Sequence, residues 1–118
     1  MRKDRSSLQY LADMLHYARQ AQTFAAGYDR DTYFADTMRK LALLHAIQII
    51  GEAAGKVDET TRQQLSDIPW RKISDCRNII AHDYDDIEEP VVWLIVTDHL
   101  PPLIAKLAAY FENQGIIL

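Results

Sequence analysis

The chain has 118 residues, of which 48% are hydrophobic and 25% are charged, with only four glycines and four prolines. That length allows one domain with a real core but not two, so we expect a single domain over residues 1–118. A formal net charge of −4 argues against a broadly basic face, and one cysteine excludes an internal disulfide and a cysteine-rich zinc site.

The hydropathy pattern predicts no membrane association. No stretch reaches about 18 uncharged apolar residues, the length needed to cross a bilayer. The first residues, Met1 to Asp4, lead into a polar amphipathic stretch that lacks the apolar segment of a signal peptide. We therefore expect a cytoplasmic protein.

The first two helices are marked by caps and by apolar residues that recur every three or four positions. Ser6 and Gln9 have the spacing of a capping box, which predicts a helix over residues 6–25. A second helix is expected over residues 31–54, because Gly55 is the next residue that favours a helix end.

The second helix has apolar residues on two nearly opposite sides, at about 100° per residue. A helix that is apolar over so much of its circumference lies centrally in a bundle or is covered by a second subunit. Gly51 on this helix could let another helix approach closely. One side carries Phe34, Met38, Leu41 and Ile49 with a polar ladder of His45, Gln48 and Glu52; the other carries Leu43, Ile47, Ile50 and Ala54.

The rest of the chain is also helical in pattern. A short helix is expected over residues 59–66 and a longer one over residues 70–82. The β-branched run over residues 91–96 resembles a buried strand, but no partner strand is visible, so we predict a helix there. Pro101 and Pro102 should interrupt or kink it before a final helix. The expected fold is an all-α, up-and-down bundle of four or five helices.

One segment carries most of the chemistry that the sequence offers. Arg77 and His82 lie five residues apart near the end of a predicted helix. Asn78 follows the arginine, and Tyr84 is two residues beyond the histidine. Asn78 and His82 share a face of a regular helix, whereas Arg77 must reach round with its long side chain. Such a group could surround a phosphate, because arginine can hold two phosphate oxygens and histidine exchanges a proton near neutral pH.

These side chains supply most of what metal-independent RNA cleavage requires. A base removes the proton of the ribose 2′-OH, an acid protonates the leaving 5′-oxygen, and a cation stabilises the phosphate. One chain has a single histidine in this segment. A symmetric dimer would bring two histidines and two arginines into one cleft.

A purely structural interpretation is open for the same residues. An arginine or histidine near a helix C-terminus often satisfies terminal carbonyls and the helix dipole. Asp83, Asp85 and Asp86 could equally pair with Arg77 in a surface network. Clustered acids in a loop are usually solvated, so we expect no metal and no cofactor. Cys76 is expected to be a small buried apolar residue.

The pattern of Arg77, His82 and Tyr84, with the polar Asn78 after the arginine, resembles the signature of the HEPN superfamily and of its HepT-like toxins. The Ile50-Gly51-Glu52-Ala53 stretch and the order and length of the helices are similar to that family as well. The resemblance implies an HEPN-like helical fold and a dimeric, metal-independent ribonuclease toxin of a toxin–antitoxin pair. It also implies that Arg77 and His82 are the catalytic residues.

A partner and a modification follow from the same resemblance. The usual partner is an MntA-like nucleotidyltransferase antitoxin, which transfers AMP from ATP to the motif tyrosine. By position that tyrosine is Tyr84. Each AMP adds bulk and negative charge beside a phosphate-binding cleft, so it should block and repel RNA.

Two other functions are open at this point. The chain could be a non-catalytic helical dimer in which Tyr84 and the acidic residues 83–89 dock a nucleotidyltransferase, as the net charge of −4 favours. It could also be a structural dimer in which neither Arg77 nor His82 matters to any activity. For Glu52 we expect a structural role, although it could line the dimer cleft.

Overall fold

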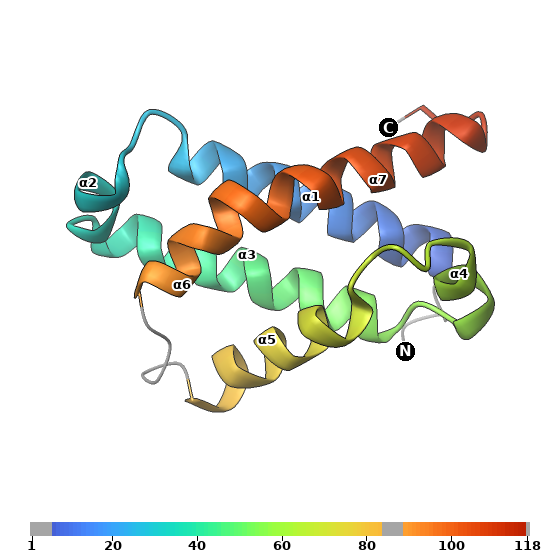
Figure 1. Ribbon diagram of the computed structural model, residues 1–118, viewed down its shortest axis with the longest axis horizontal. Coiled ribbons are helices and arrows are strands. Elements are labelled where there is room, and N and C mark those ends of the chain that lie inside the picture. The colour runs from blue at the N-terminus through green and yellow to red at the C-terminus, as the bar shows by residue number, and fades with distance from the viewer. Residues whose placement is uncertain (1–5, 84–88, 118) are drawn as a thin grey trace, which may run out of the picture.

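Long helices run alternately up and down through the molecule (Figure 1). The computed structural model describes residues 6–83 and 89–117. Within these ranges the elements are α1 (Ser7–Ala25), α2 (Arg30–Phe34), α3 (Thr37–Gly55), α4 (Glu59–Gln64), α5 (Trp70–Asp83), α6 (Glu89–Leu94), the π-helical turn η2 (Ile95–His99) and α7 (Leu100–Asn113). No strand occurs in this part of the chain, and the predicted all-α, up-and-down bundle is confirmed.

α1 and α3 form the central pair of the bundle. α1 begins with the predicted capping box, in which the Oγ atom of Ser6 accepts a hydrogen bond from the backbone N–H of Gln9 at 3.3 Å. α7 packs against α1 on the side away from α5 (Figure 1). The largest fully buried side chains come from these helices and from α2: Leu11, Met14, Leu15, Tyr33, Leu43 and Leu107.

The predicted helix over residues 31–54 is wrong in its continuity, because two helices occupy this stretch. α2 ends at Phe34 and α3 begins at Thr37. Asp36 lies between them as the N-cap of α3, where its side chain accepts a hydrogen bond from the backbone N–H of Arg39 at 3.1 Å. The apolar periodicity continues across the break, so periodicity alone could not show it.

The helix predicted over residues 91–96 is confirmed, but the expected interruption lies before the two prolines. α6 passes into the π-helical turn η2, and α7 begins directly after it at Leu100. Pro101 and Pro102 fall in the first turn of α7, where a missing backbone N–H breaks no helical hydrogen bond. The three elements form one nearly continuous helical rod (Figure 1).

The stretch Pro90–Asn113 of this rod is long and apolar enough to span a membrane, judged by length and composition alone. The search of the sequence for about 18 uncharged apolar residues did not identify this stretch, because Asp98 and Lys106 lie within it. The core helix of a folded domain meets the same test. Its inner face is buried in the bundle core, as expected of such a helix, through Leu100, Leu103, Leu107 and Phe111.

The start of α5 is tied to the rest of the bundle. The indole Nε1 atom of Trp70 donates a hydrogen bond to the carbonyl of Leu65 at 3.1 Å. Lys106 of α7 donates to the carbonyl of Asp67, just before α5, at 2.9 Å. Beyond this start α5 packs mainly on α3, so its last turn is the end farthest from these anchors.

Candidate functional site

The face of α5 that carries Arg77 lies against α3 at Gly51. Gly51 is buried, and a Cβ atom added to it would overlap the Cβ atom of Arg77 and lie 2.7 Å from its Cγ atom. Only the missing side chain at this position lets the two helices approach so closely. The expectation that Gly51 admits a neighbouring helix is confirmed.

The guanidinium group of Arg77 contacts two neighbouring side chains. Its Nη1 atom donates a hydrogen bond to Oδ1 of Asn78 at 3.1 Å, and its Nη2 atom lies 3.8 Å from Oε1 of Glu52 on α3. Gln48, one turn earlier on α3, donates to the same glutamate oxygen at 3.2 Å. The Arg77 side chain therefore crosses from α5 to the polar ladder of α3.

The exposure of this group differs along its length. The Nε atom of Arg77 is buried and has no hydrogen-bond partner among the described residues. The side chains of Arg77 and Glu52 are 34% and 44% exposed, so water reaches the ion pair itself. Exposed pairs of this kind contribute at most about 1 kcal/mol to the free energy of unfolding.

His82 lies in the last turn of α5, and its side chain is exposed. In a regular helix it stands about 7.5 Å farther along the axis than Arg77 and about 140° round from it. Asn78 is one turn before His82 on the same side, as predicted. Within one chain, Arg77 and His82 therefore lie on different sides of the last turns of α5.

The fourth predicted site residue, Tyr84, lies outside the described residues, as do Asp85 and Asp86. The prediction that these acids pair with Arg77 therefore stays a prediction, as does the expectation that they hold no metal. The contact that is seen, between Arg77 and Glu52, was not expected. The polar ladder on α3 was its only sign in the sequence, and the ladder alone does not show which helix it faces.

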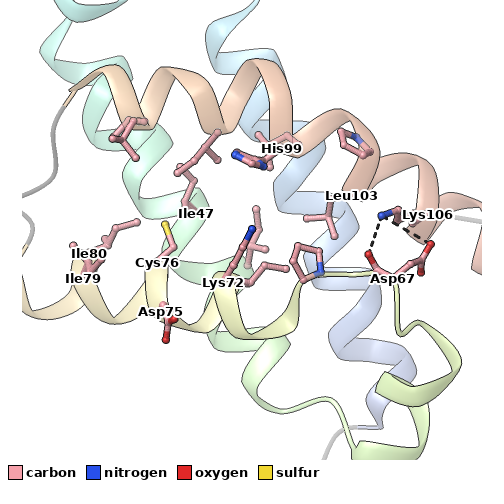
Figure 2. A pocket seen from close by; sticks show the side chains of 18 residues that line it. Ile47, Asp67, Lys72, Asp75, Cys76, Ile79, Ile80, His99, Leu103 and Lys106 are labelled. Carbon is pink, nitrogen blue, oxygen red and sulfur yellow. Dashed lines mark hydrogen bonds and ion pairs between the residues drawn. The ribbon is translucent and has the colours of Figure 1, made fainter.

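A separate apolar groove of about 730 Å³ opens on the other side of α5 (Figure 2). The groove is lined by Ile47 and Ile50 of α3, by residues of α5, and by residues of the rod of α6, η2 and α7. Arg77, Asn78 and His82 do not line it. The polar site and the apolar groove are thus distinct surfaces of the same helix.

Cys76 and His99, two residues with titratable side chains, face this groove. Cys76 projects from α5 and His99 from η2, on opposite walls (Figure 2). Burial raises the pKa of the Cys76 thiol, which favours the protonated form and makes it a poor nucleophile. Cys76 is half-buried and packs against the core, close to the small apolar residue that was predicted.

The chain matches known proteins over most of its length. Residues 14–110 match the sequence profile of a family described as HepT-like, Ribonuclease HepT-like. A protein of Methanocaldococcus jannaschii that carries a provisional RNase name is 29% identical over 94 residues, which are 80% of this chain and 86% of that protein. A protein of Thermococcus cleftensis named as a probable ribonuclease HepT is 26% identical over 102 residues, which are 86% of this chain and 93% of that protein. No solved structure gives a significant match.

A methyl group added at Gly51 should disturb the crossing of α3 and α5, because it meets the Cβ atom of Arg77. We expect Gly51→Ala to lower the free energy of unfolding by about 1–3 kcal/mol, the usual cost of overpacking. Gly55→Ala is the matched control on the same helix, since nothing lies within 4 Å of the added atom. That control should be neutral or stabilising by up to about 1 kcal/mol. Urea denaturation compares the two, and equal stabilities would show that the bundle does not depend on this close approach.

Proposed function

Because this chain belongs to the HepT-like ribonuclease family, we propose that it is a metal-independent endoribonuclease toxin of a toxin–antitoxin pair. The observation that carries the proposal is the placement of Arg77. Its guanidinium group is held at a helix crossing, remains open to solvent, and lies on the same helix as the exposed His82. The family match supports RNA as the substrate, whereas the assignment of catalytic roles to these two residues rests on their chemistry.

In the proposed reaction, the ribose 2′-oxygen attacks the adjacent phosphorus and the bond to the 5′-oxygen breaks. One His82 takes the proton of the 2′-OH, and a second His82 gives a proton to the leaving 5′-oxygen. The guanidinium group of Arg77 stabilises the charge that develops on the phosphate oxygens. The products are a 2′,3′-cyclic phosphate and a 5′-hydroxyl, so the reaction consumes no water in this step and uses no metal-bound nucleophile.

This scheme needs two histidines, and we propose that a homodimer supplies them. Met38 and Leu41 of α3 are 82% and 61% exposed, which is unusual for large apolar side chains next to a polar site. At about 100° per residue they lie on the same side of α3 as Glu52, the partner of Arg77. A second copy seated on this side would cover the apolar side chains and bring its own Arg77 and His82 toward the first.

The remaining elements of the proposal concern regulation. An MntA-like nucleotidyltransferase would transfer AMP from ATP to the Tyr84 hydroxyl, with release of pyrophosphate. Tyr84 is only two residues beyond His82 in the sequence, so AMP would be attached next to the proposed catalytic segment. Its negative charge and bulk would oppose RNA binding there. The pair would act in the cytoplasm, where its RNA substrate and ATP are found.

Removing either proposed catalytic group should abolish cleavage while leaving the fold intact. We expect Arg77→Ala and His82→Ala each to lower the rate of RNA cleavage by at least about 100-fold. Arg71→Ala and His16→Ala are matched controls at exposed helical positions and should cleave like the wild type. Cleavage of labelled RNA gives the rates, and circular dichroism checks the helix content. Normal cleavage by either site variant would refute its assignment. A wild type that never cleaves RNA but binds a nucleotidyltransferase would favour the non-catalytic dimer instead.

The proposed dimer face can be tested with a charged residue at its centre. Leu41→Glu should convert a dimer into a folded monomer, because burying an unpaired carboxylate is costly. Val91→Glu is the comparison, since Val91 is 51% exposed but lines the groove on the other side of α5. Sedimentation equilibrium measures both. If the dimer persists in Leu41→Glu and is lost in Val91→Glu, the dimer interface lies at the apolar groove and the proposed face is wrong.

The antitoxin relationship predicts a change of mass. Co-expression with an active MntA-like nucleotidyltransferase should add one or more AMP units to the intact protein and lower its cleavage of RNA. Tyr84→Phe should abolish the added mass. Tyr10→Phe, which changes a tyrosine distant from Tyr84 in the sequence, should keep it. Intact-mass spectrometry distinguishes them. An added mass that persists in Tyr84→Phe would place the modification elsewhere.

A further inference from the structure

The first part of the Arg77 side chain is fixed by packing, but its terminal group is not. Its Cβ and Cγ atoms lie directly over Gly51, and its Nε atom is buried without a partner among the described residues. These contacts leave the Nη1 and Nη2 atoms to be oriented by what they meet beyond the crossing. Of the two partners they meet, Glu52 is the one that belongs to another helix.

We propose that Glu52 is a positioning residue for Arg77, an inference that rests on the proposed ribonuclease function. Glu52 follows Gly51 directly in α3, so one helix provides both the space for the arginine stem and the carboxylate for its tip. Gln48 donates a hydrogen bond to the Oε1 atom of Glu52 at 3.2 Å, which holds the carboxylate in turn. The chain of contacts therefore runs from Gln48 through Glu52 to Arg77.

Counting donors shows what this arrangement leaves available. A guanidinium group has five N–H bonds: two on each terminal nitrogen and one on Nε. Among the described residues, Asn78 takes one hydrogen of Nη1 of Arg77, Glu52 faces Nη2 at 3.8 Å, and the single Nε hydrogen is buried. Within this part of the chain, both terminal nitrogens thus keep hydrogens for the oxygens of a phosphate.

The carboxylate should affect the two kinetic constants differently. Its negative charge disfavours the binding of an RNA phosphate beside it, so its removal should not weaken binding. Its contact with Nη2 of Arg77 fixes the plane of the guanidinium group, so its removal should lower the rate of the chemical step. A group that merely bound RNA would change KM, and a merely structural group would change stability.

The test uses the full chain with Glu52→Gln, which keeps the size of the side chain and removes its charge. We expect kcat to fall by about tenfold or more, while KM stays the same or decreases. Glu112→Gln, the same change on an exposed residue of α7, should leave both constants unchanged. The free energy of unfolding should change little in either variant, because a solvent-exposed ion pair stabilises weakly. An unchanged kcat, or a lower kcat accompanied by an equally large rise in KM, would overturn the positioning role.

A second measurement does not depend on cleavage. In protein labelled with nitrogen-15, rotation of the Arg77 guanidinium about its Nε–Cζ bond should be slow in the wild type and faster in Glu52→Gln. Arg39, whose Nε atom lies 3.3 Å from Asp36, is an internal control and should not change. Unchanged rotation of Arg77 would overturn the proposal even if the protein cleaves RNA. If rotation depends on Glu52 in a protein that cleaves no RNA, the ribonuclease function fails and the orientation of Arg77 by Glu52 stands.

Discussion

The close crossing of α3 and α5 at Gly51 is the contact on which the rest of the candidate site depends. It requires a residue without a side chain on α3, because the Cβ and Cγ atoms of Arg77 occupy that space. The same crossing places the tip of Arg77 beside Glu52 and leaves His82 exposed at the free end of α5. One packing constraint between two helices thus sets the position of the cation that the proposed reaction uses.

Local features of the sequence predicted the helices well where caps and periodicity agree. The Ser6–Gln9 capping box marked the start of α1, and the boundaries of α5 matched the stretch predicted for it. The break between α2 and α3 at Asp36 was not predicted, because apolar residues continue on both sides of it. Only the cap geometry of the folded chain reveals it. The contact between Arg77 and Glu52 was not predicted for a different reason. It depends on the relative orientation of α3 and α5 about their axes, which the pattern within a single helix does not indicate.

The candidate site is compatible with the acidic net charge, because it depends on one cation, Arg77, and on the side chains next to it. Arg77 is surrounded by neighbours that hold it, while α5 carries the exposed His82 at its end. The exposed Met38 and Leu41 lie on the same side of α3 as Glu52, the partner of Arg77, so the proposed dimer and the proposed two-histidine site would use one surface. The apolar groove on the other side of α5 is separate from this chemistry.

The chemical ends of the RNA fragments test the central claim most directly. RNA would be incubated with the purified protein in the presence of EDTA, and the fragment ends would be identified by mass spectrometry. Cleavage by Arg77 and His82 without a metal predicts fragments that end in a 2′,3′-cyclic phosphate, or in the phosphate formed by its hydrolysis, and that begin with a 5′-hydroxyl. Cleavage that stops in EDTA and resumes with Mg²⁺, or that leaves a 5′-phosphate and a 3′-hydroxyl, would contradict the account.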